Sequence, residues 1–219
     1  MSANKTLPPT HRTLRQVAGV CGLLGVITAT SSLALAILYS PSNFSITQNW
    51  LSDLGGTSYI EIMDAVPRPM VSSPTTELLF NSGLVLVGVL GIVFALGLLS
   101  AAPSPTYRLG AVCMLLGLAA EAGIGLLPEP LGVIHDVITL VFVIFCAVGM
   151  FLMGGSLVVS SVKPLGWFSI ALGIIALASS SQYVIWRAAA EIIFSAAISL
   201  WIVVFSIRML RRVAPQNIE

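Results

Sequence analysis

The sequence predicts an all-α, polytopic membrane protein, a bundle of six transmembrane helices with a long extracytoplasmic loop between the first and the second. Of its 219 residues, 57% are hydrophobic and 9% are charged, and the mean hydropathy is +0.99. A soluble domain carries about a quarter charged residues, because its surface faces water. Here the apolar residues form uninterrupted runs of about twenty, the length of a helix that spans a bilayer. A membrane β-barrel would instead show segments of about ten residues with alternating polarity.

Proline and serine mark the helix boundaries. Pro41 ends the first apolar run, since proline cannot continue a helix. Ser73-Pro74 and Ser104-Pro105 each combine a capping serine with a proline at the first helical position. The expected spans are about 16–39, 78–99, 106–127, 132–159, 165–182 and 187–207. They form a single membrane domain (16–210), flanked by an N-tail (1–15) and a C-tail (211–219), with an outer loop at 40–77.

The lysines and arginines predict the orientation. If the N-tail is cytoplasmic, eight of the ten basic residues lie on the cytoplasmic side and two lie outside. This asymmetry is the positive-inside pattern of membrane proteins. We therefore expect a multi-pass protein of the cell membrane with both termini in the cytoplasm. The inside set is Lys5, Arg12, Arg15, Arg108, Lys163, Arg208, Arg211 and Arg212, and the outside set is Arg68 and Arg187.

The acidic residues point to a site near the outer face. Glu121 and Glu191 fall within the expected helices, and burying a carboxylate in hydrocarbon costs several kcal/mol. Both should therefore face the bundle interior or a wet cavity. In an enzyme, Glu121 or His135 would act as general base, while Asp53 or Asn81 would orient substrate or water. The catalytic candidates are Glu121, His135 and Asp53, and the substrate-binding candidates are Asn49, Ser52, Asn81, Asp136, Arg187 and Glu191.

Most of these residues also have a purely structural interpretation. Arg187 and Glu191 lie one helical turn apart and could form an intrahelical ion pair. His135 could be a hydrogen-bonded interfacial histidine, and segment 49–56 could be a turn that docks the loop on the bundle. No HxxxH or HExxH pair supports a metal site, so no metal ligand is predicted. The three cysteines lie in apolar runs without CxxC spacing and are interpreted as small buried side chains.

Several short motifs occur in a recognisable order. They are NWLSDLG (49–55), SSPTTELLFNSGLVLVG (72–88), GIGLLPEP (123–130) and IHD (134–136). With these motifs, essentially the whole chain resembles the domain of unknown function 998 family, which are six-helix prokaryotic membrane proteins. It is more loosely similar to the eukaryotic Frag/DRAM/Sfk proteins, which are associated with lipid-anchor remodelling and membrane trafficking. The positions that match the latter pattern are Ser52, Asp53, Gly55, Pro74, Phe80 and Asn81. The resemblance implies a fold and leaves the activity open.

Three functions are compatible with the sequence. The favoured hypothesis is an outward-facing polar cluster that binds or acts on lipid head groups. One alternative is a structural or partner-binding scaffold, because glycines in the helices permit close packing within or between chains. The other is a small transporter with Glu121 beside its path. The expected partners are the lipid bilayer and a lipid ligand at the outer face. No cofactor and no nucleic acid are predicted, an oligomer is possible, and enzymatic activity is left open.

Overall fold

The computed structural model describes residues 9–41, 44–56, 71–160, 162–180 and 183–211. Within these residues six helices are long and apolar enough to cross a membrane, and no strand occurs. The predicted all-α, six-helix class is therefore confirmed. The helices are α1 (Pro9–Leu38), α2 (Pro74–Ser100), α3 (Pro105–Leu126), α4 (Val133–Val158), α5 (Lys163–Ser180) and α6 (Tyr183–Arg211), with short 3-10 turns η1 (Ser52–Gly55) and η2 (Glu129–Leu131).

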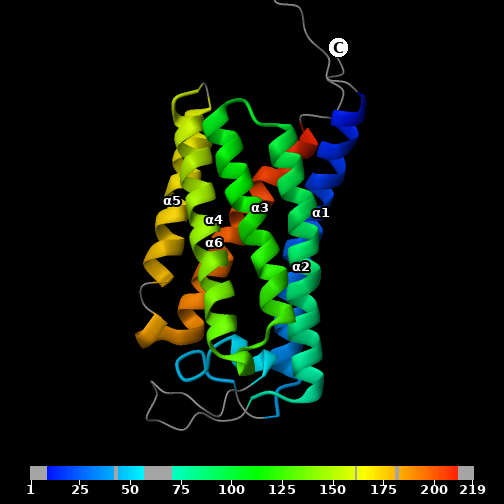
Figure 1. The fold of residues 1–219 in the computed structure, drawn as a ribbon, viewed down its shortest axis with the longest axis vertical. Helices are drawn as coiled ribbons and strands as arrows, with labels where there is room; N and C mark the ends of the chain where they lie inside the picture. The colour runs from blue at the N-terminus through cyan, green and yellow to red at the C-terminus, as the bar shows by residue number, and fades with distance from the viewer. Residues whose placement is uncertain (1–8, 42–43, 57–70, 161, 181–182, 212–219) are drawn as a thin grey trace, which may run out of the picture.

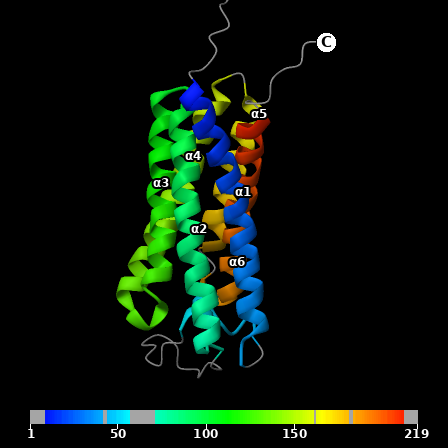
Figure 2. The same cartoon turned by 90° about the vertical axis from the view of Figure 1, so that its right-hand side faces the viewer.

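The helices form a closed ring in chain order. Each helix packs against the next one along the chain, and α6 also packs against α1 (Figures 1 and 2). The start of α1 and the end of α6 lie at the same end of the bundle, which we call the terminus end. The opposite end, called the loop end, carries the α1–α2, α3–α4 and α5–α6 connections. An even number of spans thus brings both ends of the described chain together.

The expected start signals cap α2 and α3. The Ser73 hydroxyl accepts a hydrogen bond from the backbone N–H of Thr76 at 3.2 Å, and the Ser104 hydroxyl accepts one from Tyr107 at 3.1 Å. Each bond satisfies an amide that has no partner within the helix. Since the cap at Ser73 starts the helix, α2 begins at Pro74, inside the region 40–77 that was expected to be loop.

The first and last helices differ most from their expected spans. Helix α1 begins at Pro9, within the expected N-tail 1–15, and α6 extends to Arg211. Helical hydrogen bonds do not need an apolar environment, so polar turns can extend a helix beyond the hydrocarbon. In the polar extension of α1, Arg15 Nη2 donates to the backbone oxygen of Ser100 at 2.9 Å. Lys5, Arg68 and Arg212 of the orientation argument lie outside the described residues.

The terminus half of the bundle is tightly filled. Trp201 of α6 is fully buried and meets Phe94 of α2 edge-to-face, with ring centroids 6.1 Å apart. Its indole Nε1 donates to the Ser169 hydroxyl at 2.7 Å, and that hydroxyl donates to the backbone oxygen of Met150 at 2.9 Å. The indole nitrogen thus finds a polar partner although the ring lies in the apolar centre. Through this one side chain, α6 contacts both α2 and α5.

Candidate functional site

A buried turn organises the loop end. We call residues 44–56, which include η1, the docking segment. Asn49 and Asp53 are fully buried within it. One Asp53 oxygen accepts hydrogen bonds from Asn49 Nδ2 at 2.9 Å and from the backbone N–H of Trp50 at 3.0 Å. The Asn49 side-chain oxygen accepts from the backbone N–H of Ser45 at 3.1 Å. The polar residues of the NWLSDLG motif therefore hold the turn in shape.

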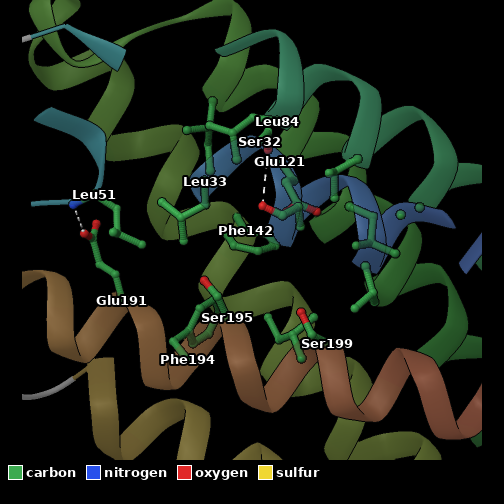
Figure 3. Close-up of a pocket in the computed structure, with 18 of the residues that line it drawn as sticks. Ser32, Leu33, Leu51, Leu84, Glu121, Phe142, Glu191, Phe194, Ser195 and Ser199 are labelled. Atoms are coloured by element: carbon green, nitrogen blue, oxygen red, sulfur yellow. Dashed lines mark hydrogen bonds between the residues drawn. The ribbon is translucent and has the colours of Figure 1, made fainter. Parts of the chain in front are cut away.

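Hydrogen bonds join the docking segment to two helices. Asn81 of α2 donates through Nδ2 to the backbone oxygen of Gly55 at 2.8 Å. Glu191 of α6 accepts from the backbone N–H of Leu51 at 2.5 Å (Figure 3). The backbone N–H of Ala188 donates to the backbone oxygen of Asn49 at 3.0 Å. Because these bonds reach both α2 and α6, the segment bridges two sides of the ring.

Arg187 contacts the docking segment from a kink in α6. Its φ of 38° is non-helical and lies in the left-handed region, which a non-glycine residue rarely adopts. Its guanidinium donates to the backbone oxygen of Gln48 and lies 6.0 Å from the ring centroid of Trp50. That distance is within the range of a cation–π contact. The strained backbone at Arg187 therefore coincides with a contact that ties α6 to the segment.

Replacing Asn81 with aspartate should loosen the docking segment. Aspartate cannot donate to the Gly55 oxygen and places a carboxylate against a carbonyl. We expect amide hydrogen exchange in residues 49–56 to become about tenfold faster, equivalent to about 1.4 kcal/mol. The adjacent Ser82→Ala is the control, since the exposed Ser82 hydroxyl bonds its own helix at Leu78. Equal exchange in both variants would contradict a docking role for Asn81.

Beneath the docking segment lies a cavity of about 490 Å³. Its walls come from α1, α2, α3, α4 and α6, and Leu51 and Ser52 of the docking segment contribute to its lining at the loop end. Along α1 the lining runs from Cys21 to Leu33, a length of about 18 Å at 1.5 Å per residue. The cavity thus extends over about half of the roughly 30 Å hydrocarbon thickness. Its size falls within the usual range of ligand sites, about 300–1,000 Å³.

The mouth of the cavity lies between α1 and α6. Three residues line the cavity and are also exposed on the molecular surface: Thr30 of α1, and Ser195 and Ala196 of α6. The other described lining residues are buried or half-buried. A residue that is exposed and also lines a cavity marks the place where the cavity reaches the surface. Because both helices are candidate membrane spans, this mouth faces the region that lipid chains occupy.

Polar side chains are few in the cavity and lie on different walls. Glu121 of α3 points toward Ser32 of α1, and Ser195 and Ser199 of α6 point into the same space (Figure 3). The hydroxyl oxygen of Thr139 on α4 is buried and makes no hydrogen bond in the described structure. Most of the remaining lining is apolar. The site is therefore a mostly apolar chamber with two acidic side chains, Glu121 and Glu191, and several hydroxyls on its walls.

His135 lies at the loop end of the cavity and is buried. Its Nδ1 lies 2.8 Å from the backbone oxygen of Leu127. A carbonyl oxygen only accepts, so Nδ1 is the donor, and in the neutral ring Nε2 is then an acceptor. The bond also ties the start of α4 to the end of α3. His135 thus has the structural contact proposed for it and remains part of the cavity wall.

The structure brings together only part of the predicted site. Glu121 and His135 line the cavity, whereas Asp53 lies inside the docking segment and does not line it. The predicted catalytic group of three therefore does not share one chamber. Among the substrate-binding candidates, Ser52 and Glu191 line the cavity. The others lie elsewhere: Asn49 is buried in the docking segment, Asn81 and Arg187 contact that segment, and Asp136 is exposed at the start of α4.

Sequence reasoning missed the cavity hydroxyls. Ser195 and Ser199 lie one helical turn apart and so share a face of α6, a pattern that the sequence does contain. Ser32 and Thr139 have no comparable pattern. Within the described part of the chain, no group of three or more His, Cys, Asp and Glu residues is placed to hold a metal ion. The cavity lining itself offers carboxyl, imidazole, hydroxyl and, at Cys21, thiol groups.

The fold and the cavity define the class, a multi-pass membrane protein of six helices, five of which line an internal chamber. The chain belongs to the family described as "Protein of unknown function (DUF998)", which matches residues 15–208. This match confirms the family resemblance and includes all of the docking segment and the cavity lining. No curated protein and no solved structure matches the chain. The looser similarity to the Frag/DRAM/Sfk proteins stays a prediction.

Proposed function

We propose that this protein binds a lipid within the membrane, with a hydrocarbon chain in the cavity and access between α1 and α6. The observation that carries the proposal is the exposed mouth formed by Thr30, Ser195 and Ala196. A mouth between two membrane-spanning helices opens toward lipid chains, which need not pass through water to reach it. This geometry favours a lipid over a water-soluble ligand.

The cavity walls favour a hydrocarbon occupant. A buried water needs two to four polar partners, and a mostly apolar chamber supplies them only near its few hydroxyls. Hydrocarbon makes dispersion contacts with every apolar wall atom, and each contact contributes about 0.1–0.2 kcal/mol. Many such contacts along an 18 Å wall add up to a substantial affinity. A lipid chain is the membrane component that matches these walls.

The dimensions of the cavity favour a single hydrocarbon chain as its occupant. A volume of about 490 Å³ over a length of about 18 Å corresponds to a mean cross-section of roughly 27 Å². An α-helix with its side chains is about 10–12 Å across and would need about three times that area. The chamber is therefore too narrow for a partner helix, which argues against a scaffold that inserts a helix here.

The distribution of charge supports an outward-facing mouth. Arg15, Arg108, Lys163, Arg208 and Arg211 belong to the terminus end, whereas Arg187 lies at the loop end. Under the positive-inside rule the terminus end faces the cytoplasm of a cell membrane. The mouth of the cavity, which lies in the loop half, would then open to the outer leaflet. This orientation is part of the proposal.

The contacts favour binding over transport or catalysis. A transport path would have to continue through the terminus half, where Trp201 and Phe94 are fully buried. Catalysis would need an oriented acid–base pair, and the Asp53 carboxylate accepts hydrogen bonds from its own turn. Glu121 and His135 remain available for polar contacts with the head of a lipid. Recognition of a lipid head group by these residues is therefore the form of the original hypothesis that we retain.

Closing the mouth should abolish lipid binding. Ala196→Trp places a large ring at the exposed rim of the cavity without disturbing the buried core. We expect at least a tenfold loss of labelling by a photoactivatable single-chain lipid in native membranes. Leu200→Trp is the matched control, because Leu200 is on the same helix, is 49% exposed and does not line the cavity. If both variants are labelled like the parent protein, the lipid is not held in this cavity.

A further inference from the structure

The ionisable side chains of the cavity include acids but no lysine or arginine among the described lining residues. The two acidic residues are Glu121 and Glu191. The Glu191 carboxylate accepts a hydrogen bond from the backbone N–H of Leu51 and is thus engaged with the docking segment. Glu121 lies deeper, about one and a half turns before the end of α3, and points into the chamber (Figure 3). The chamber therefore presents one carboxylate to whatever occupies it.

The ionised form of this carboxyl group needs a positively charged partner, which the described lining does not supply. A charge within the hydrocarbon costs several kcal/mol unless it is paired or faces water. In a low-dielectric site an ammonium group can repay part of that cost through a charge-assisted hydrogen bond. A second carboxylate or a phosphate would instead be repelled. The charge of the wall thus discriminates between lipid head groups.

The other polar atoms near Glu121 add hydrogen-bond acceptors. In the neutral ring, His135 has an acceptor at Nε2, because its Nδ1 donates to Leu127. The hydroxyl of Thr139 is buried, makes no hydrogen bond to any residue that the structure describes, and can accept as well as donate. Ser32 extends this group from the opposite wall (Figure 3). An ammonium group has three donors and no acceptor, which matches a wall rich in acceptors.

The position of Glu121 also determines in which direction the hydrocarbon chain of a bound lipid would run. Glu121 faces Ser32 near the loop end of the cavity, while the lining of α1 continues down to Cys21. This leaves about 16 Å of mostly apolar wall on the terminus side of Ser32. A head group at Glu121 would therefore place its chain toward the middle of the bilayer, as in an ordinary leaflet.

From these observations, and resting on the lipid-binding function proposed above, we propose that the cavity selects a single-chain lipid with a protonated amine head group. The ammonium group donates to the Glu121 carboxylate, and the chain occupies the apolar wall between Ser32 and Cys21.

The test compares three probes with the same sixteen-carbon chain that differ only in the head: a primary amine, an alcohol and a carboxylate. The full-length protein is placed in nanodiscs of zwitterionic lipid, and each probe competes with the photoactivatable lipid for labelling of the protein. Protein-free nanodiscs correct for partition of the probes into the bilayer. We expect the amine to compete at least tenfold better than the alcohol, and the carboxylate to compete worst. In Glu121→Gln, the amine should lose this advantage to within about twofold of the alcohol. Glu77→Gln, the same change outside the cavity, should retain it.

The outcomes separate the two proposals. Unchanged competition by the alcohol in Glu121→Gln shows that the variant is folded with an intact chamber. If all three probes compete equally in the parent protein, the amine preference is wrong while lipid binding stands. The same holds if the carboxylate competes best. If no probe competes and Ala196→Trp changes nothing, the lipid-binding function itself fails. The preference of the parent protein tests the inference even if Glu121→Gln does not fold.

Discussion

Replacing Gly88 with valine should prevent the bundle from assembling. A Cβ atom at Gly88 would lie 2.5 Å from the Cβ and 2.7 Å from the Cα of Ala122 on α3, and would also collide with the Ala122 backbone nitrogen. Backbone atoms cannot rotate away as a side-chain tip can, so α2 and α3 would have to separate. Overpacking costs about 1–3 kcal/mol where neighbours can shift, and more here. We expect at least a tenfold loss of monodisperse protein in size-exclusion chromatography after extraction.

Gly155→Val is the control for this prediction. A Cβ at Gly155 on α4 meets nothing within 4 Å, so the same substitution adds a side chain without a clash. Its yield and thermal stability should stay close to those of the parent protein. If Gly88→Val also behaves like the parent, the close contact between α2 and α3 does not exist as described. If both variants fail, valine in these helices is harmful for reasons unrelated to packing.

Removing the Asp53 carboxylate should release the docking segment. In Asp53→Ala, Asn49 Nδ2 and the Trp50 N–H lose an acceptor inside a buried turn. A hydrogen bond to a charged group contributes about 1.5–3 kcal/mol, so the loss of two should exceed the local stability of the turn. We expect fast hydrogen exchange and new protease cleavage in residues 44–56. Lipid labelling should also fall, because Leu51 and Ser52 of this segment line the cavity.

Two further variants make this result interpretable. Asp53→Asn retains one side-chain oxygen that can accept, so it should be less affected than Asp53→Ala. Thr47→Ala removes an exposed hydroxyl of the same segment that bonds to Ser45, and it should leave exchange unchanged. Normal protection in Asp53→Ala would rule out a structural role for the carboxylate. Loss of labelling with normal protection would instead support the catalytic or binding role first considered for Asp53.

Local signals made the helices predictable. The apolar runs predicted six spans. Serine–proline pairs marked the starts of α2 and α3, and Ser73 and Ser104 cap these helices. These features act within a few residues of one another, so they can be read from the chain. The start of α1 at Pro9 was not predictable from hydropathy, because a helix can continue past the hydrocarbon.

The composition of the site was harder to predict, because it depends on contacts between segments that are distant in the sequence. The sequence indicated that Glu121 should face the interior, because a carboxylate in hydrocarbon is costly. Nothing local indicated that it would point toward Ser32, since neighbours around the ring depend on how helices pack. Asp53 was a catalytic candidate because, in a sequence, a carboxylate in a turn looks the same whether it faces a ligand or its own backbone. Only its buried bonds to Asn49 and Trp50 distinguish the two cases.

The ring has one junction that differs from the others. Neighbouring helices are consecutive in the chain everywhere except at α1 and α6, the first and the last. No connecting peptide therefore limits how far these two can part, and the mouth of the cavity lies between them. Near the terminus end they are held by Gly19 against Leu210 and by Gly22 against Ser206 and Ile202. The two helices therefore contact each other closely near the terminus end, whereas at the loop end the docking segment, which follows α1, is hydrogen-bonded to α6. In chain order, α6 follows all the other helices that line the cavity.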